Sequence, residues 1–187
     1  MEAKLLDLLP VRRGHFLLAS GHHGNLWLDL DALFLQPANL LPFVGELAHR
    51  LSRHRIECVV GPLVGGALVA QSVAAELGIQ FAFAEDRSYR IPEAFHRPLA
   101  GKRVAIVDDA INAGSATRAT YTALKSLGAA PVAAGALLML GSTAVPFLEA
   151  NNLPLERIAA LHNELWDPAD CPLCKAGQPL SNPPASP

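Results

Sequence analysis

The chain has 187 residues, of which 51% are hydrophobic, and a formal net charge of −2. This length is typical of one domain with a sizeable core, and the near-neutral charge excludes an extended basic face for nucleic acid. The longest apolar run, from Ala129 to Leu140, is too short to cross a bilayer, and acidic residues near the N-terminus argue against a signal peptide. We therefore expect a cytoplasmic protein that binds neither nucleic acid nor a membrane.

The N-terminal region predicts a short helix followed by two strands. Residues 1–10 have the pattern of an amphipathic helix that ends at Pro10. Residues 14–21 and 25–30 then indicate two short strands joined by a turn rich in glycine and histidine. Trp27 alternates with leucines in the second strand, which is more typical of a core residue than of a platform for base stacking.

Helices and strands alternate in the rest of the chain. Helices are predicted at 37–53, 65–77, 116–127 and 143–151, and strands at 56–60, 80–84, 104–107, 130–140 and 158–161. A polar loop without a strong period occupies 85–102. This alternation predicts an α/β fold, a single domain with a mainly parallel, doubly wound sheet. Ligands of such sheets bind at the carboxyl ends of the strands, where the strand order reverses.

The most informative segment is the strand, turn and helix from Val104 to Thr117. Four apolar residues are followed by Asp108 and Asp109, and a turn of small residues then opens the helix. The backbone amides of such a turn form a seat for a phosphate. Two carboxylates would repel that phosphate, but they can accept hydrogen bonds from sugar hydroxyls or help to hold Mg²⁺. The expected phosphate-binding residues are Asn112, Ala113, Gly114, Ser115, Ala116 and Thr117.

This segment resembles the signature with which type I phosphoribosyltransferases bind 5-phosphoribosyl 1-pyrophosphate (PRPP). Asn112 stands where that family usually has threonine. A receiver domain also has an acidic pair after a strand, but no phospho-acceptor aspartate follows near Leu153. A nucleotide-binding P-loop is excluded because Gly-Lys-Ser/Thr is absent. The remaining alternative is a plain strand–turn–helix with solvated aspartates.

A second turn, after the strand at 56–60, contains adjacent glycines that let backbone amides approach a ligand. Alone, it would indicate ordinary close packing of a helix on a strand. Beside the PRPP signature it resembles the pyrophosphate loop of the same family, and the implied pyrophosphate-binding residues are Pro62, Leu63, Val64, Gly65 and Gly66.

Residues 14–29 resemble the opening of orotate phosphoribosyltransferases, in which this region forms a hood over the base. The resemblance implies base or hood roles for Ser20, His22 and His23, although the two histidines in a polar turn are also typical of plain surface residues. It further implies Mg²⁺ as cofactor, PRPP and a nucleobase as substrates, and a homodimer. Asp108 and Asp109 would be catalytic.

Further departures from the family pattern lie in the hood and in the two loops. Ala19 stands where a basic residue is usual, and Val64 stands where many members have lysine. The mobile catalytic loop, here 86–97, contains no lysine and offers Arg87 and Arg90 to neutralise the departing pyrophosphate. We therefore expect transfer of ribose 5-phosphate to a nucleobase, with orotate as the first choice. The alternative is a PRPP-binding regulator or a catalytically silent paralogue.

The C-terminal region contains Cys171 and Cys174, which have the spacing of half a zinc site. Only His162 and Asp170 lie near them in the sequence, so a reduced pair of thiols is favoured over a zinc site. The domain is expected to span 1–176, with the hood at about 1–36. Residues 177–187 are rich in proline and serine and are expected to form a disordered tail.

Overall fold

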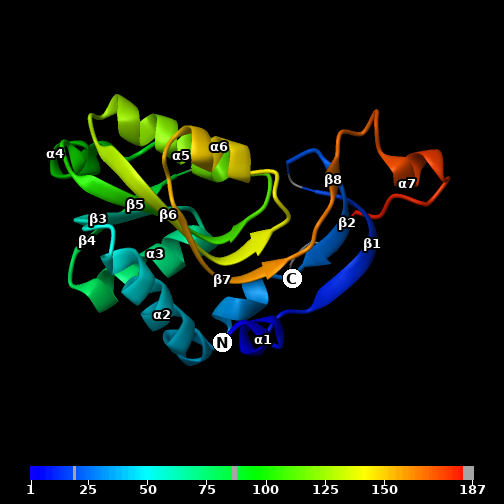
Figure 1. The fold of residues 1–187 in the computed structure, drawn as a ribbon, viewed down its shortest axis with the longest axis horizontal. Helices are drawn as coiled ribbons and strands as arrows, with labels where there is room; N and C mark the ends of the chain where they lie inside the picture. Colours follow the sequence, from blue (N-terminus) through cyan, green and yellow to red (C-terminus); the bar gives the residue numbers. More distant parts are fainter. Residues whose placement is uncertain (19, 86–87, 183–187) are drawn as a thin grey trace.

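The computed structural model describes residues 1–18, 20–85 and 88–182. Its centre is a five-stranded sheet in which every neighbouring pair is parallel and the strand order is β4-β3-β5-β6-β7. The strands are β3 (Cys58–Pro62), β4 (Gln80–Ala84), β5 (Arg103–Ile111), β6 (Ala130–Leu140) and β7 (Leu155–Leu161). Helices α2 (Leu41–Ser52) and α3 (Gly65–Leu77) cover one face, and α5 (Ser115–Ser126) and α6 (Val145–Ala150) cover the other (Figure 1). The predicted α/β fold is confirmed.

The apolar residues of β5 divide between the two faces of the sheet. Ala105 and Val107 belong to the core beneath α2 and α3, whereas Val104 and Ile106 pack with Leu124 of α5. Successive side chains of a strand point to opposite faces, so a strand that is buried on both sides reads as a continuous apolar run. This is why 104–107 is uninterrupted in the sequence.

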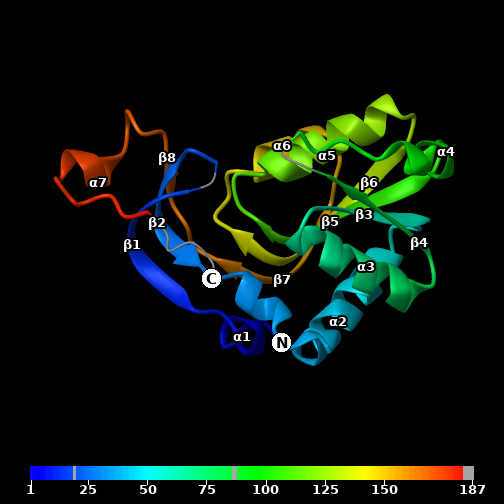
Figure 2. The same cartoon turned by 180° about the vertical axis from the view of Figure 1, so that it is seen from behind.

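A second, antiparallel sheet lies beside the carboxyl ends of the central strands, and we call it the hood. It has the order β1-β2-β8 and consists of β1 (Val11–Leu17), β2 (His23–Leu28) and β8 (Leu165–Trp166). Figure 2 shows β8 beside β2, although more than 130 residues separate them in the chain. The hood therefore also takes in C-terminal residues, which the expected boundary of about 1–36 did not include.

Shorter elements complete the described chain. They are α1 (Glu2–Leu6), η1 (Asp31–Phe34), η2 (Pro37–Asn39), η3 (Glu93–Phe95), α4 (His96–Leu99) and α7 (Pro172–Lys175). Two of them, η3 and α4, lie in the segment predicted as a loop. None of the helices in the described ranges has the length and apolar character that a membrane crossing requires.

The structure corrects the prediction of a disordered tail for the part of it that is described. The Ser181 amide donates to the His15 carbonyl at 2.8 Å, and the Leu17 amide donates to the Ser181 carbonyl at 3.1 Å. The free edge of β1 supplies these backbone partners, and an edge strand can pair with any extended segment, whatever its side chains. The rest of the predicted tail, residues 183–187, lies outside the described residues.

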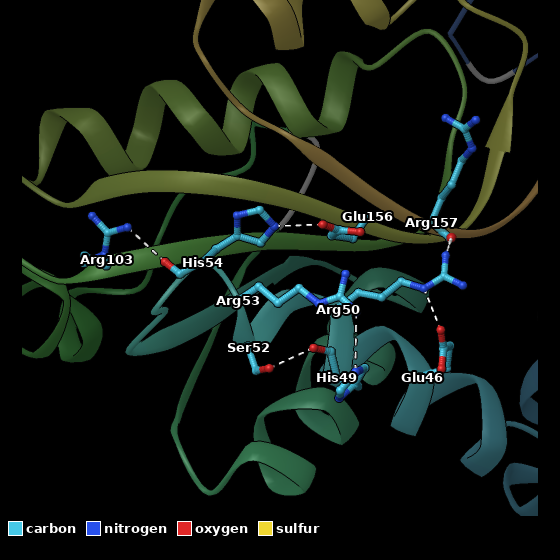
Figure 3. A network of polar contacts seen from close by, with 9 residues as sticks. All are labelled: Glu46, His49, Arg50, Ser52, Arg53, His54, Arg103, Glu156 and Arg157. Carbon is cyan, nitrogen blue, oxygen red and sulfur yellow. Dashed lines mark hydrogen bonds and ion pairs between the residues drawn. The ribbon is translucent and has the colours of Figure 1, made fainter.

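A polar network joins the end of α2 to the amino ends of β5 and β7 (Figure 3). The Arg103 guanidinium donates to the His54 carbonyl at 2.9 Å, and His54 Nε2 lies 2.8 Å from Glu156 Oε1. Arg50 donates to the Arg157 carbonyl and pairs with Glu46. These contacts give partners to the His54 carbonyl, just after the helix, and to the Arg157 carbonyl of β7. They lie at the end of the sheet opposite the carboxyl ends of the strands.

Candidate functional site

The sheet order places the two predicted ligand-binding turns next to each other. β4, the next strand in the chain, pairs with one edge of β3, and β5, which follows β4 in the chain, pairs with the other edge. The turn after β3 (residues 62–66, the glycine turn) and the turn after β5 (residues 112–117, the α5 turn) both begin at this reversal. Doubly wound sheets bind their ligands at such a point.

A cavity of about 410 Å³ lies between the α5 turn and the hood. Its walls come from β2, from the end of β5, from the start of α5 and from Leu140 of β6. Asp108 lines it, as does Trp27, whose ring the Arg12 guanidinium approaches at 5.3 Å. All six residues predicted to bind a phosphate line this cavity, and among the predicted hood residues Ser20 does so.

Asp108 of the acidic pair is buried and Asp109 is half-buried, and neither has a cationic partner among the described residues. Asp108 is 7% exposed, and among the described residues no ion pair involves it or Asp109. Burial raises the pKa of the Asp108 carboxyl well above its ordinary value, and the nearby Asp109 adds to the increase. Burial also raises the pKa of Asp109, with a contribution from Asp31. A bound cation or bound hydroxyl donors would stabilise the charged form of these carboxylates.

The glycine turn lies directly against these two carboxylates. A Cβ atom on Gly65 would collide with the Asp109 carboxylate, and one on Gly66 would collide with Asp108 Oδ1 and come within 2.8 Å of Pro62 Cδ. Only glycine permits this approach. The turn does not line the cavity itself, and its two apolar side chains, Leu63 and Val64, are 45% and 70% exposed.

The α5 turn has the geometry of an anion seat. Gly114 has a φ of 76° and precedes Ser115, the first residue of the twelve-residue helix α5. The first amides of a helix have no partner within it and favour a negative group. The Thr117 hydroxyl is buried beside them and has no hydrogen-bond partner among the described residues. A phosphate at this position would satisfy these donors.

Asn163 is a contact of the α5 turn that the sequence analysis missed. Its Nδ2 donates to Asn112 Oδ1 at 2.8 Å, and the Asn163 side chain is buried. With its oxygen held in this way, Asn112 keeps its own amide group for donation toward the cavity. No local motif marks Asn163, since 51 residues separate it from Asn112.

Two histidines expected in the substrate pocket are not found there. His23 is the first residue of the hood strand β2, but it is 6% exposed and faces His15 instead of the cavity. His22 is half-buried and its Nδ1 lies 3.2 Å from the Ser20 hydroxyl. Neither histidine lines the cavity.

Of the two arginines predicted to be catalytic, Arg90 does not line the cavity. Arg90 forms an ion pair with Glu85 and their backbones pair, so this end of the loop is closed on itself. Arg87 lies outside the described residues. Bringing Arg90 to a ligand requires this segment to move.

Comparison with known proteins finds a matching family model, similar sequences and similar solved structures. The family model described as "Phosphoribosyl transferase domain" matches residues 37–146. The orotate phosphoribosyltransferase of Caldanaerobacter subterraneus is 31% identical, with 97% of this chain and 96% of the relative covered. That of Thermotoga maritima is 33% identical, with 92% and 91% covered. The crystal structure of Mycobacterium tuberculosis orotate phosphoribosyltransferase superimposes with a TM-score of 0.67 at 22% identity, covering 85% of this chain and 93% of that one.

Proposed function

Because the chain belongs to the phosphoribosyltransferase family, we propose that it transfers ribose 5-phosphate from PRPP to orotate, a step of pyrimidine nucleotide biosynthesis. A ring nitrogen of orotate loses its proton and bonds to C1 of the ribose, and the bond from C1 to pyrophosphate breaks, so that pyrophosphate leaves with the electron pair. The observation that carries the proposal is the buried acidic pair between the glycine turn and the α5 turn. This arrangement fits a ligand that has a phosphate at one end, a diol in the middle and a pyrophosphate at the other end.

Each part of the site then has a distinct role. The amides of the α5 turn and the Thr117 hydroxyl hold the 5′-phosphate, and the amides of the glycine turn hold pyrophosphate. Asp108 and Asp109 accept hydrogen bonds from the ribose hydroxyls and favour the positive charge that develops at C1. Catalysis is mainly positioning and electrostatics. Closure of the 86–97 loop excludes water and brings Arg87 and Arg90 to the departing pyrophosphate.

The residues present also fit the proposed Mg²⁺. Carboxylate oxygens are the ligands that Mg²⁺ prefers, and the buried pair has no cation of its own among the described residues. When bound with PRPP, Mg²⁺ would neutralise charge on the pyrophosphate. Asp108 and Asp109 are the residues that would hold it, directly or through its water shell.

Exposed apolar side chains support the proposal of a homodimer. Leu63, Val64 and Leu68 are 45%, 70% and 41% exposed, and the Leu68 amide donates to the Val64 carbonyl, so the three are neighbours. Contiguous exposed apolar groups mark association surfaces. Sedimentation velocity of the purified chain distinguishes a dimer from a monomer. A cytoplasmic location agrees with a biosynthetic enzyme of this kind and is likewise proposed.

The experiment that tests the proposed activity is pyrophosphate release from PRPP and Mg²⁺ by the purified chain, with orotate, uracil and the purine bases each supplied in turn. We expect release with orotate alone. Release with another base keeps the transferase and replaces its acceptor. PRPP binding without release for any base would favour the alternative function, a PRPP-binding regulator.

The contact between Asn163 and Asn112 predicts a binding defect rather than a chemical one. Asn163→Ala should raise the KM for PRPP about 3- to 10-fold, the effect of losing a hydrogen bond worth ~1 kcal/mol, with a smaller change in kcat. Asn112→Thr removes the amide that Asn163 positions, so Asn163→Ala should have little further effect in that background. A fall in kcat at unchanged KM, or equal effects in both backgrounds, would contradict the positioning role.

A further inference from the structure

Four side chains that the proposed reaction does not use meet beside the hood. His15 comes from β1 and His23 from the start of β2. Cys171 immediately precedes α7, and Cys174 lies within it. One ligand atom from each lies within 4.8 Å of all the others. His15, His23 and Cys171 are 2%, 6% and 0% exposed. None of the four lines the cavity, so this cluster is separate from the PRPP site.

Four of the six separations between these atoms are close to those of a tetrahedral zinc site. With Zn–N bonds of about 2.05 Å and Zn–S bonds of about 2.3 Å, two nitrogens lie about 3.3 Å apart and a nitrogen and a sulfur about 3.5 Å apart. In this structure His15 Nε2 lies 3.1 Å from His23 Nδ1 and 3.3 Å from Cys171 Sγ. Cys174 Sγ lies 3.3 Å from His23 Nδ1 and 3.8 Å from His15 Nε2.

The contact on the other nitrogen of His15 shows how its ring is oriented. Nδ1 lies 2.9 Å from the Gln178 carbonyl, which can only accept, so Nδ1 carries the proton. In the neutral ring Nε2 is then a lone pair, and it points at the other three ligand atoms. A second hydrogen bond from a ligating histidine to a backbone carbonyl is the usual way in which proteins orient such a ring.

The strand around His15 is adapted to turn this side chain inward. The pairing of β1 with β2 shifts register between Arg13 and Phe16, and His15 and Phe16 are both buried, which breaks the alternation of a regular strand. Bulges of this kind redirect a side chain at the cost of regular pairing. Apolar packing alone does not explain why a histidine side chain is buried beside two thiols.

We propose that His15, His23, Cys171 and Cys174 bind one zinc ion in a closed structural site. Two thiolates and two imidazoles in tetrahedral positions are a donor set typical of structural zinc. The ion would bond α7 to the β1–β2 hairpin and so hold the hood over the cavity. A disulfide between Cys171 and Cys174 is the competing state, but its sulfurs carry no proton to donate, so the Nε2 lone pair of His15 would face them without a partner.

The test is the zinc content of the full chain, expressed without a metal-binding tag, purified under reducing conditions and analysed by inductively coupled plasma mass spectrometry. We expect about one zinc per chain, falling at least tenfold in Cys171→Ser/Cys174→Ser. Two variants serve as controls and should keep their zinc. Cys58→Ala removes the remaining thiol, whose pKa burial raises to about 12, and His162→Ala/Asp170→Ala removes the candidate ligands that are neighbours in the sequence.

A second measurement covers the case in which the double-cysteine variant does not fold. Wild-type protein stripped with a chelator should take up one equivalent of Co²⁺, with the visible absorption of a tetrahedral thiolate site, and one equivalent of Zn²⁺ should remove that absorption. Stripping should also lower the midpoint of thermal unfolding. The proposal is overturned if the reduced wild-type chain neither contains zinc nor takes up either ion, or if the double-cysteine variant keeps its zinc. None of these measurements depends on the activity.

Discussion

Asp108→Asn/Asp109→Asn should lower kcat/KM for PRPP by at least about 10³-fold and, in the absence of ligand, raise the midpoint of thermal unfolding. The loss follows from the roles of the two carboxylates, because removing one group that stabilises charge in a transition state typically costs ~10²- to 10³-fold. The gain in stability follows from their burial. The pKa of each is raised mainly because the charged form is desolvated.

The pH dependence has a definite sign. A carboxyl whose pKa is higher in the folded than in the unfolded state holds its proton longer when folded, so stability falls as the pH rises above the unfolded value of about 3.9. The wild type should therefore become less stable than the variant as the pH rises from about 4 to neutral, where the difference is largest. The stabilities of the two proteins should converge near pH 4. Each ~1 kcal/mol corresponds to about 2–4 °C in a chain of this size.

Calorimetry across this pH range, with steady-state kinetics at neutral pH, checks both effects. Asp7→Asn is the matched control, since Asp7 is exposed at the end of α1 and should change neither quantity. Unchanged activity in the double variant would remove the basis of the proposed function. An unchanged unfolding midpoint at neutral pH would mean that the buried charges are compensated in the free protein.

Gly65→Ala should reduce kcat/KM by about 10²-fold or more without unfolding the chain. The added Cβ collides with the Asp109 carboxylate, so either that carboxylate or the glycine turn must move. Displacements of about 1 Å at a reacting centre cost ~10²-fold. We expect the KM for PRPP to rise as well, because the same turn is proposed to hold pyrophosphate.

Gly45→Ala is the matched control for this substitution. Gly45 lies within α2, and a Cβ there meets nothing within 4 Å. Alanine in a helix should stabilise the chain by ~0.5–1 kcal/mol and leave kinetics unchanged. Kinetics with PRPP and circular dichroism on both variants separate a local displacement from a folding defect. Wild-type kcat/KM in Gly65→Ala would show that the glycine turn tolerates a side chain against Asp109.

The central sheet was predictable because its elements have strong local patterns. The strand at 80–84, the helix at 65–77 and the strand at 130–140 agree with the structure to the residue. Each is predominantly apolar, and a glycine or a polar residue follows its last residue: Gly78, Glu85 and Gly141. The strand of the acidic pair is longer than predicted, because its ladder with β6 continues past the carboxylates to Ile111.

The hood and its surroundings were less predictable because their partners are distant in the chain. β8 has two residues and exists only because β2 presents an edge to it, so no local pattern could reveal it. Cys171 was recognised as a candidate ligand, but its neighbours were sought in the adjacent sequence. In the structure they are His15 and His23, about 150 residues away.

The hood combines N-terminal strands with C-terminal residues, so it can be completed only late in synthesis. The acidic pair, both turns and the central strands are all present once residue 161 has emerged from the ribosome. The third strand of the hood is residues 165–166, and the partner of the β1 edge is Ser181. Domains fold as the chain emerges, N-terminal parts first. Every residue that lines the cavity lies at or before Leu140, so the last contacts to form are those of β8 with β2 and of Ser181 with β1, on the outer side of the hood.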